Sequence, residues 1–305
     1  MDVKVESLFR MHQQNIEWPR EGVLLQTCSR TRIKSGQRKS PGSTLGGMKK
    51  YLPISVVLLW GSGCSKDVVR VHDGAVEDRE VVLILPGLGY DNAGIRHMED
   101  FADTLYAEEF DVVVPNYLAR RGLDRAIDNV NLTLDDYALR DYAGLHVFAY
   151  IAGTWAINTI MQEEELENLS SIVYDRSPLQ ERAPTLATTQ IPVLAKLLFG
   201  SVIFDIADTP FPEVDLPDAS VGIMIENVAT AFILRNKEAA LDMSPLSFEV
   251  EDLDQDYDDV VHLPLNHDDM YRSFDIVGPE LIHFFQTGLF TDEAEREPLG
   301  GDPFE

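Results

Sequence analysis

The sequence predicts an α/β fold with a doubly wound, mostly parallel sheet. Three observations lead to this prediction. Several short runs of consecutive apolar residues have the pattern of strands that are buried on both faces. Segments with helical apolar spacing separate these runs, and strands that alternate with helices favour a parallel sheet. The 305 residues are also enough for one large domain with a substantial core.

The amino-terminal half of the predicted domain contains three strands. The first, at 81–86, ends in a Pro-Gly-Leu-Gly turn and precedes a helix with apolar residues at helical spacing over 93–110. The second strand is predicted at 111–116, and a short amphipathic helix at 132–143. The third strand, 146–151, is continuously apolar, so we expect it at the centre of the sheet. A helix should follow it to about residue 165.

The carboxyl-terminal half continues the alternation with one interruption. Residues 183–220 are apolar and punctuated by prolines, which predicts an inserted cap of helices over the carboxyl ends of the strands. An ordinary crossover helix with long loops is the alternative. After the strand at 221–226, the segment VATAFILRN either extends that strand or forms a helix. The other predicted elements are strands at 171–175 and 259–265 and a closing helix at 276–290.

The domain organisation follows from changes in composition. Residues 1–47 are basic and polar and are predicted to be disordered or a mis-called extension before the true start at Met48. Residues 48–63 have the features of a signal peptide, and 64–290 should form the α/β domain. The tail 291–305 is acidic, contains Pro and Gly, and is predicted to be disordered.

The signal segment has a basic start, an apolar core and small residues in that order. Lys49 and Lys50 precede the run YLPISVVLLWG, and Ser62 and Gly63 precede Cys64. The run is too short to span a bilayer. The segment resembles a bacterial lipoprotein signal, although Gly61 stands where that family usually has a branched aliphatic residue. The resemblance implies a lipid on Cys64 and a membrane-anchored protein of the cell envelope. The alternative is a cytoplasmic protein in which this stretch is a docking segment or a first strand.

Charge is distributed very unevenly along the chain. Of the 25 Lys and Arg and the 52 Asp and Glu, residues 1–50 hold ten and four, a net charge of +6. The remaining residues hold fifteen and forty-eight, a net charge of −33. So acidic a body would repel phosphates, which argues against nucleic acid as a partner. Two cysteines, Cys28 and Cys64, provide neither a disulfide framework nor a metal-ligand spacing.

The stretch HVFAYIAGTW, residues 146–155, has the pattern of a strand, a tight turn and a helix. This is the context of a nucleophile elbow, G-x-S-x-G. Ala149 and Gly153 occupy the two small positions, and Ile151 occupies the nucleophile position. A hydrocarbon side chain cannot attack a carbonyl carbon. The elbow also normally holds its central residue at positive φ, which a β-branched side chain disfavours. We therefore expect a relaxed turn, or an Ile151 that packs in the core.

The order of motifs resembles the α/β-hydrolase superfamily, of the lipase and esterase type, over roughly residues 78–290. The loop Leu85–Gly89 is similar to the one that donates an oxyanion-hole amide, which implies that role for Gly87, Leu88 and Gly89. The loop Asn266–Asp269 is similar to the one with the catalytic histidine, here His267.

The resemblance leaves the acid and the nucleophile open. Asp175 and Glu226 both precede His267, as the order of the catalytic triad requires, and nothing in the sequence selects between them. Thr154 and Ser177 carry hydroxyls nearby, but neither occupies the strand-to-helix turn. We predict that neither is a nucleophile.

No cofactor or metal is predicted. Asp252, Asp254, Asp256 and Asp258 alternate like the start of a calcium loop, but Tyr257 stands where that loop requires Gly. His262 and His267 are not on one helical face, so their spacing does not suit zinc.

Two hypotheses about function follow. The first is a lipid-anchored pseudo-hydrolase whose cleft binds a small-molecule or acyl ligand, or a partner, without catalysis. The second is an esterase-like or lipase-like hydrolase that uses a non-standard nucleophile or a water activated by His267. The first is favoured because the missing hydroxyl is the hardest part to replace.

Overall fold

The computed structural model describes residues 67–88, 92–253 and 255–305. All of them belong to the second of the two units into which the chain divides, Gly61–Glu305. The predicted extension 1–47, the signal segment 48–63 and Cys64 lie outside the described residues. Within the described part, no helix combines the length and the apolar character needed to cross a bilayer.

A seven-stranded sheet forms the middle layer, with the strand order β1-β3-β2-β4-β5-β6-β7. All neighbouring strands are parallel except β1, which pairs with β3 in the antiparallel direction. The doubly wound, mostly parallel sheet is thus confirmed. The strands are β1 (Val68–Arg70), β2 (Glu80–Leu85), β3 (Asp111–Val114), β4 (Gly144–Ala149), β5 (Leu169–Arg176), β6 (Ser220–Glu226) and β7 (Asp259–Leu263).

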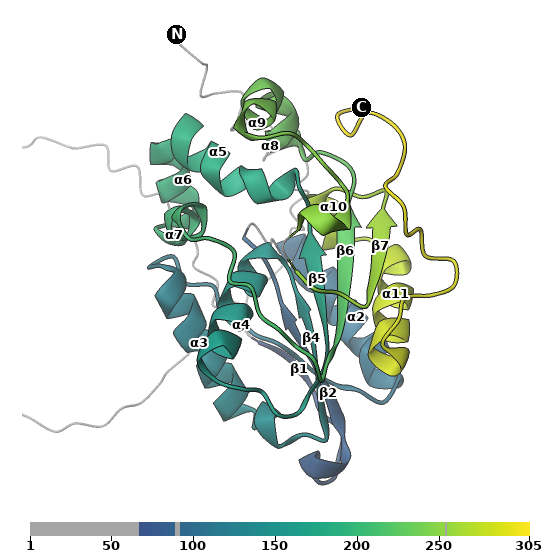
Figure 1. The fold of residues 1–305 in the computed structure, drawn as a ribbon. Helices are drawn as coiled ribbons and strands as arrows, with labels where there is room; N and C mark the ends of the chain where they lie inside the picture. The colour runs from purple at the N-terminus through teal and green to yellow at the C-terminus, as the bar shows by residue number, and fades with distance from the viewer. Residues whose placement is uncertain (1–66, 89–91, 254) are drawn as a thin grey trace, which may run out of the picture. The chain divides into compact units, whose positions relative to one another are not determined.

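Four helices cover the two faces of the sheet (Figure 1). On one face, α2 (Asn92–Ala107) and α11 (Phe274–Thr287) pack through Met98, Val277 and other apolar residues. On the other face lie α3 (Leu123–Asp136) and α4 (Ile151–Glu163). Successive residues of β2 alternate between these cores, because side chains of a strand point to opposite faces. The continuous apolar runs in the sequence reflect this double coverage.

Strand β4 is the fourth of the seven strands, and all six of its residues are buried. The prediction that this strand is central is therefore confirmed. The observed strand, Gly144–Ala149, begins two residues before the predicted one and ends two residues earlier. Helix α4 begins at Ile151, so the tight turn between strand and helix is reduced to Tyr150.

The helix predicted at 132–143 has the wrong bounds, because the helix of this region is α3 (Leu123–Asp136) and overlaps the prediction only over residues 132–136. Its buried residues, among them Ala126 and Val130, recur at helical spacing between charged residues. Ala138 adopts a left-handed conformation with φ of 51°, which ends the helical path immediately after the C-cap at Tyr137. The apolar residues after that point belong to a 3-10 turn.

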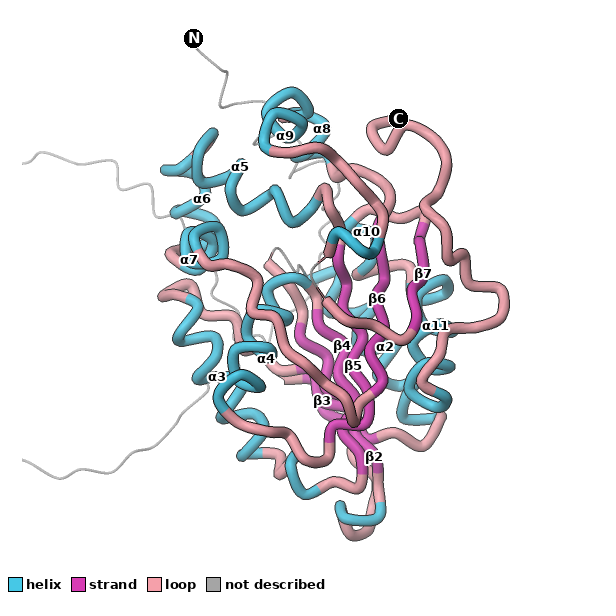
Figure 2. Tube along the Cα trace, in the orientation of Figure 1, coloured by secondary structure: helices cyan, strands magenta, loops and turns pink. Residues whose placement is uncertain are grey.

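Helices also lie beyond the carboxyl ends of the strands (Figure 2). Between β5 and β6 the chain forms α5 (Ala183–Gln190), α6 (Pro192–Phe199) and α7 (Val202–Asp208). After β6 it forms α8 (Ala231–Arg235) and α9 (Lys237–Met243), so VATAFILRN contains a helix and does not extend the strand. Between β7 and α11 lies the short α10 (His267–Met270). Residues 209–219, within the predicted cap, form no helix.

The carboxyl-terminal tail differs from the prediction of disorder, because it is held by specific bonds. The His262 amide at the edge strand β7 donates to the Glu295 carbonyl, at 2.7 Å, and Arg296 forms an ion pair with Asp259. Further along, the Ala229 amide donates to the Pro303 carbonyl, at 2.8 Å. The tail thus covers part of an edge strand, whose free backbone groups otherwise attract other strands. The prediction of disorder relied on the acidic composition of the tail, which does not reveal these contacts.

Candidate functional site

The carboxyl ends of three neighbouring strands bring three of the predicted site residues together. Asp175 is the penultimate residue of β5, and Glu226 is the last residue of β6. His267 follows β7 as the first residue of α10. The carboxyl ends of parallel strands lie at the same end of the sheet, and ligand sites of this fold class lie at that end. The Asn266 side chain caps α10 by accepting a hydrogen bond from the Asp269 amide, which fixes the start of that helix.

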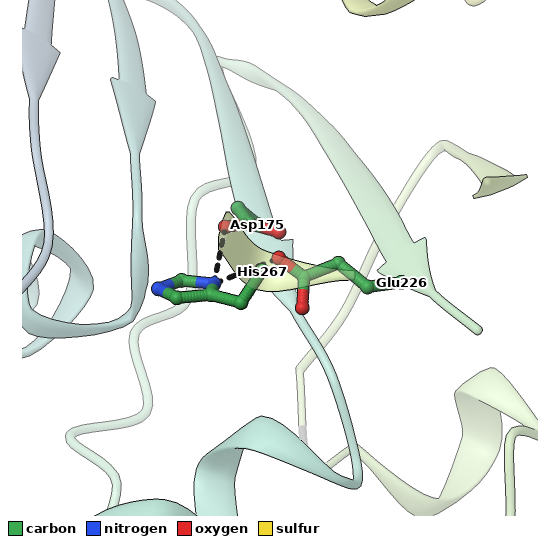
Figure 3. Close-up of side chains that lie close together, drawn as sticks. All are labelled: Asp175, Glu226 and His267. Atoms are coloured by element: carbon green, nitrogen blue, oxygen red, sulfur yellow. Dashed lines mark hydrogen bonds and ion pairs between the residues drawn. The ribbon is translucent and has the colours of Figure 1, made fainter. Parts of the chain in front are cut away.

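The imidazole of His267 lies against both carboxylates (Figure 3). Its Nδ1 is 2.7 Å from Glu226 Oε1, a hydrogen-bond distance, and 3.4 Å from Asp175 Oδ2. Asp175 and Glu226 are completely buried, and His267 is 5% exposed. The geometry therefore makes Glu226 the hydrogen-bonded partner of His267, with Asp175 as a second charge beside the pair. The sequence left this choice open.

The other side of the imidazole faces a tyrosine that the sequence analysis did not consider. The Tyr271 hydroxyl lies 3.3 Å from His267 Nε2 and accepts a hydrogen bond from the Gly87 amide, at 2.9 Å. A β-carbon at Gly87 would come within 2.4 Å of that hydroxyl, so only glycine leaves room for it. Tyr271 is itself 5% exposed. The predicted oxyanion-hole amide of Gly87 is thus bonded to a side chain of the protein.

Tyr271 could have been found from its spacing. It follows His267 by four residues, and residues four apart lie on the same side of a helical turn. It stacks on Tyr150, with ring centroids 4.3 Å apart, and the Tyr150 hydroxyl donates to the Met270 carbonyl. The residue of the strand-to-helix turn that faces His267 is therefore Tyr150, with its ring perpendicular to the imidazole at 6.2 Å.

Ile151 packs away from this cluster. It belongs to an apolar group with Trp155 of α4 and with Val202 and Ile206 of α7. The described residues with positive φ, other than glycine, are Glu109 and Ala138, so the turn at Ile151 is not strained. This agrees with the expectation of a relaxed turn and a packed isoleucine. Of the other oxyanion-loop residues, Leu88 packs beside α7, and Gly89 lies outside the described residues.

The two hydroxyl residues considered as nucleophiles have structural contacts. Thr154 is completely buried, and its hydroxyl donates to backbone carbonyls of the preceding turn. The Ser177 hydroxyl donates to the Glu226 carbonyl, at 3.2 Å, and accepts a hydrogen bond from the Gln180 amide. Both hydroxyls are therefore engaged within the fold.

Burial and mutual repulsion set the protonation of the cluster. Burial, and after it the repulsion of the neighbouring Asp175 carboxylate, raises the pKa of Glu226 to about 8, although His267 offsets part of the rise. Burial alone would lower the pKa of His267, but the attraction of Glu226 and Asp175 outweighs it and raises this pKa well above its usual value. Burial also raises the pKa of the Tyr271 hydroxyl well above 10. The cluster therefore retains protons at neutral pH.

The same three side chains are the group in the described part of the chain that could hold a metal ion. One ligand atom from each of Asp175, Glu226 and His267 lies within 4.8 Å of the others. Neither Asp175 oxygen has a hydrogen-bond partner among the described residues. Imidazole and carboxylate ligands suit a divalent transition metal. Such an ion would have to displace the hydrogen bond between His267 and Glu226.

Stability should fall as the pH rises through this cluster. A group whose pKa is raised by folding contributes stability that is complete below its unfolded pKa and lost as the pH rises through the folded value. For Glu226 this window runs from about 4.5 to about 8. We expect the free energy of unfolding, measured with urea, to fall between pH 5 and pH 8 by up to about 1.4 kcal/mol per pH unit for one proton. Glu226→Gln should flatten this slope, and Glu238→Gln, on an exposed helix face, should not. Equal slopes in both variants would contradict the assignment.

Comparisons with known proteins identify relatives in structure alone. No protein-family model matches the sequence, and no characterised protein matches it in sequence. Solved structures that it resembles include the mature lipase BlEst2 of Bacillus licheniformis, at 12% identity over 58% of this chain and 78% of that chain, with a TM-score of 0.41. Est1E of Butyrivibrio proteoclasticus has 12% identity over 70% and 89%, with a TM-score of 0.43. Mouse alpha/beta hydrolase domain-containing protein 10 has 14% identity over 68% and 88%, with a TM-score of 0.39.

These likenesses concern the fold and carry no statement about substrates. The strand order, the flanking helices and the position of His267 after β7 make up the α/β-hydrolase-like architecture that the sequence motifs predicted.

Proposed function

We propose that this chain is a lipid-anchored, cell-envelope protein of α/β-hydrolase-like fold that binds a ligand or partner and has no serine-hydrolase activity. One observation carries the second part of this proposal. The Tyr271 hydroxyl lies between the Gly87 amide and His267 Nε2, the two groups that would serve a reacting oxygen in a hydrolase. The protein's own side chain therefore takes the position that a nucleophile and a substrate oxygen would need.

Tyr271 is unsuited to act as the nucleophile itself. Its pKa is raised well above 10 by burial, so its reactive phenolate form is disfavoured at neutral pH. Its hydroxyl oxygen also accepts the Gly87 hydrogen bond, which leaves that amide unavailable to a developing oxyanion. The ring stacks on Tyr150, which opposes its displacement. These features support a closed, non-catalytic site.

The envelope location is supported by the sequence alone. The order of Lys49-Lys50, a short apolar run and Ser62-Gly63-Cys64 is that of a lipoprotein signal. A lipid on Cys64 would hold the domain at a membrane without a spanning helix.

A hydrolase with an unusual nucleophile or a water activated by His267 is the second candidate. The observation in its favour is the 2.7 Å hydrogen bond between His267 and Glu226. In hydrolases a carboxylate orients the imidazole that acts as the general base. This function requires Tyr271 to leave its position, so that a substrate oxygen can reach the Gly87 amide.

The two candidates predict different results with fluorophosphonate probes and activated esters. We expect no labelling, no burst with p-nitrophenyl acetate, and the same background turnover in wild type and His267→Ala, because no acyl-enzyme can form. Labelling that disappears in Thr154→Ala or Ser177→Ala would overturn the non-catalytic proposal. Turnover that survives both substitutions but falls about 10²–10⁴-fold in His267→Ala would instead establish a water activated by the histidine. Circular dichroism of each variant verifies that the fold is retained.

A further inference from the structure

The exposed apolar side chains of the domain gather at one end. Eleven large apolar side chains are exposed among the described residues, and six of them belong to the three helices α6, α8 and α9. These helices lie beyond the carboxyl ends of the strands (Figure 1). The six residues are Val193, Leu197, Leu198, Leu234, Leu241 and Met243. Single exposed apolar residues are ordinary, but a concentration of them marks an interaction surface.

Helix α6 is the most exposed part of this group. Val193 is 83% exposed and Leu197 is 63% exposed, and Ala195 is the buried residue of the helix. Lys196 is the one polar residue of this helix, and a helix so largely apolar normally lies within a core or a membrane. Here it lies on the surface of a domain whose sequence is otherwise strongly acidic.

Positive charge accompanies the α6 part of this apolar group, whereas α9 carries exposed acidic residues. Lys196 of α6 is exposed, as are Arg120 and Arg121 in the loop after β3. The Arg120 guanidinium donates to the Leu197 carbonyl, and the Ser201 amide donates to the Arg120 carbonyl, so the loop and the end of α6 are bound together. Three exposed cations therefore lie in and beside α6, on a body that has few of them. Basic residues next to exposed apolar side chains are typical of segments that lie on anionic membranes.

The described chain enters the domain beside the loop that bonds to the end of α6. The Asp67 carboxylate accepts a hydrogen bond from the Asn116 amide, just beyond the carboxyl end of β3, and Arg120 follows Asn116 by four residues. Strand β1 pairs with β3 from Val68 opposite Val114, which places the entry at that same level of the sheet. Cys64 precedes Asp67 by three residues, a span of at most about 11 Å in extended chain. A lipid on Cys64 would therefore hold this end of the domain near a bilayer.

We propose that α6, α8 and α9, together with Arg121 and Lys196, form a surface that rests on an anionic lipid bilayer; we call it the cap surface. Its apolar side chains enter the interface between headgroups and acyl chains, and its cations meet the lipid phosphates. The orientation rests on the proposed anchor at Cys64, whereas the affinity of the cap surface for lipid does not. The carboxyl ends of the strands, and with them His267, then face the membrane.

A fluorescent label tests the contact directly. The full chain with Cys28→Ser and Cys64→Ser receives one new cysteine, either through Val193→Cys or through Leu289→Cys, labelled with an environment-sensitive NBD group. Leu289 is a matched control, because it is 50% exposed and adjoins Phe290, whose amide bonds to Asp259 at the amino end of β7. With vesicles of phosphatidylglycerol and phosphatidylcholine, we expect the emission at position 193 to rise at least two-fold and shift to the blue, with little change at position 289. No response at 193, or an equal response at both positions, would overturn the proposal.

Reversing the charge of two cations provides the second test of the proposal. In the Val193→Cys background, Arg121→Glu combined with Lys196→Glu should raise the lipid concentration at half-saturation about ten-fold or more on anionic vesicles, because cations near a charged surface are attracted to it. An unchanged titration would contradict the role of these cations. Intact-mass analysis of the wild-type membrane fraction tests the anchor separately. If Cys64 is unmodified but the emission at position 193 responds to vesicles, only the proposed anchor is refuted. If Cys64 is lipidated but the emission at position 193 does not change, only the proposed cap surface is refuted.

Discussion

Replacing His267 with alanine is expected to lower the free energy of unfolding at pH 7 by about 3–5 kcal/mol. Asp175 and Glu226 are completely buried, and neither Asp175 oxygen has a hydrogen-bond partner among the described residues. Removal of the imidazole leaves two buried carboxyl groups side by side without their positive partner, so that each must carry an unpaired charge or take up a proton at pH 7, and either is strongly destabilising. Urea denaturation followed by circular dichroism measures the loss. The loss should be smaller at pH 5, where protons neutralise the carboxylates.

A double-variant cycle separates charge from lost packing. If the two ionisable carboxyl groups cause the loss, Glu226→Gln added to His267→Ala should recover part of it, since Gln is neutral at pH 7 without taking up a proton. If the two losses simply add, then packing rather than charge explains the effect, and the electrostatic description of the cluster is wrong.

The second large effect is expected from Gly153→Ala, which should destabilise the domain by about 3 kcal/mol. A β-carbon at Gly153 would lie 2.5 Å from the Leu85 carbonyl oxygen and 2.6 Å from the Leu85 β-carbon. Backbone of the central sheet cannot move aside as a side-chain tip can, so α4 would have to shift away from β2. The same denaturation measurement applies, with thermal unfolding as a second readout.

Gly278 in α11 provides the matched control. It is also a glycine inside a helix, but a β-carbon there would first meet the Phe101 ring, at 3.1 Å, which can yield slightly. Alanine gains about 1 kcal/mol of helix propensity over glycine. Gly278→Ala should therefore change the free energy of unfolding by less than about 1 kcal/mol. Similar losses at the two glycines would show that close approach of α4 to β2 is not the cause.

Much of the fold was predictable because a strand that is buried on both faces consists of apolar residues. Strands covered by helices on both faces must be apolar throughout, so six of the seven strands could be recognised as apolar runs. Strand β1 has three residues and lies at the edge, where it needs no such run. Helix α3 was misplaced because its buried residues are separated by charged ones, and the next apolar residues downstream resembled a helix of their own.

The candidate site was predictable in its chemical groups but not in its pairing. The order of Asp175, Glu226 and His267 along the chain follows from the motifs. Which carboxylate bonds to the histidine depends on differences of less than 1 Å between the ends of β5 and β6, because their distances to Nδ1 are 3.4 Å and 2.7 Å. No local pattern encodes so small a difference.

The sequence alone determined that the nucleophile position of the elbow lacks a hydroxyl, since Ile151 has a hydrocarbon side chain. Only the tertiary structure decided that the Tyr271 hydroxyl contacts both the Gly87 amide and His267. Tyr271 and Gly87 are 184 residues apart in the chain, and their contact arises because the parallel order of β2, β4 and the later strands brings their carboxyl ends to one edge. Apolar periodicity is a local property of the chain, whereas a hydrogen bond between distant loops depends on the packing of the whole sheet.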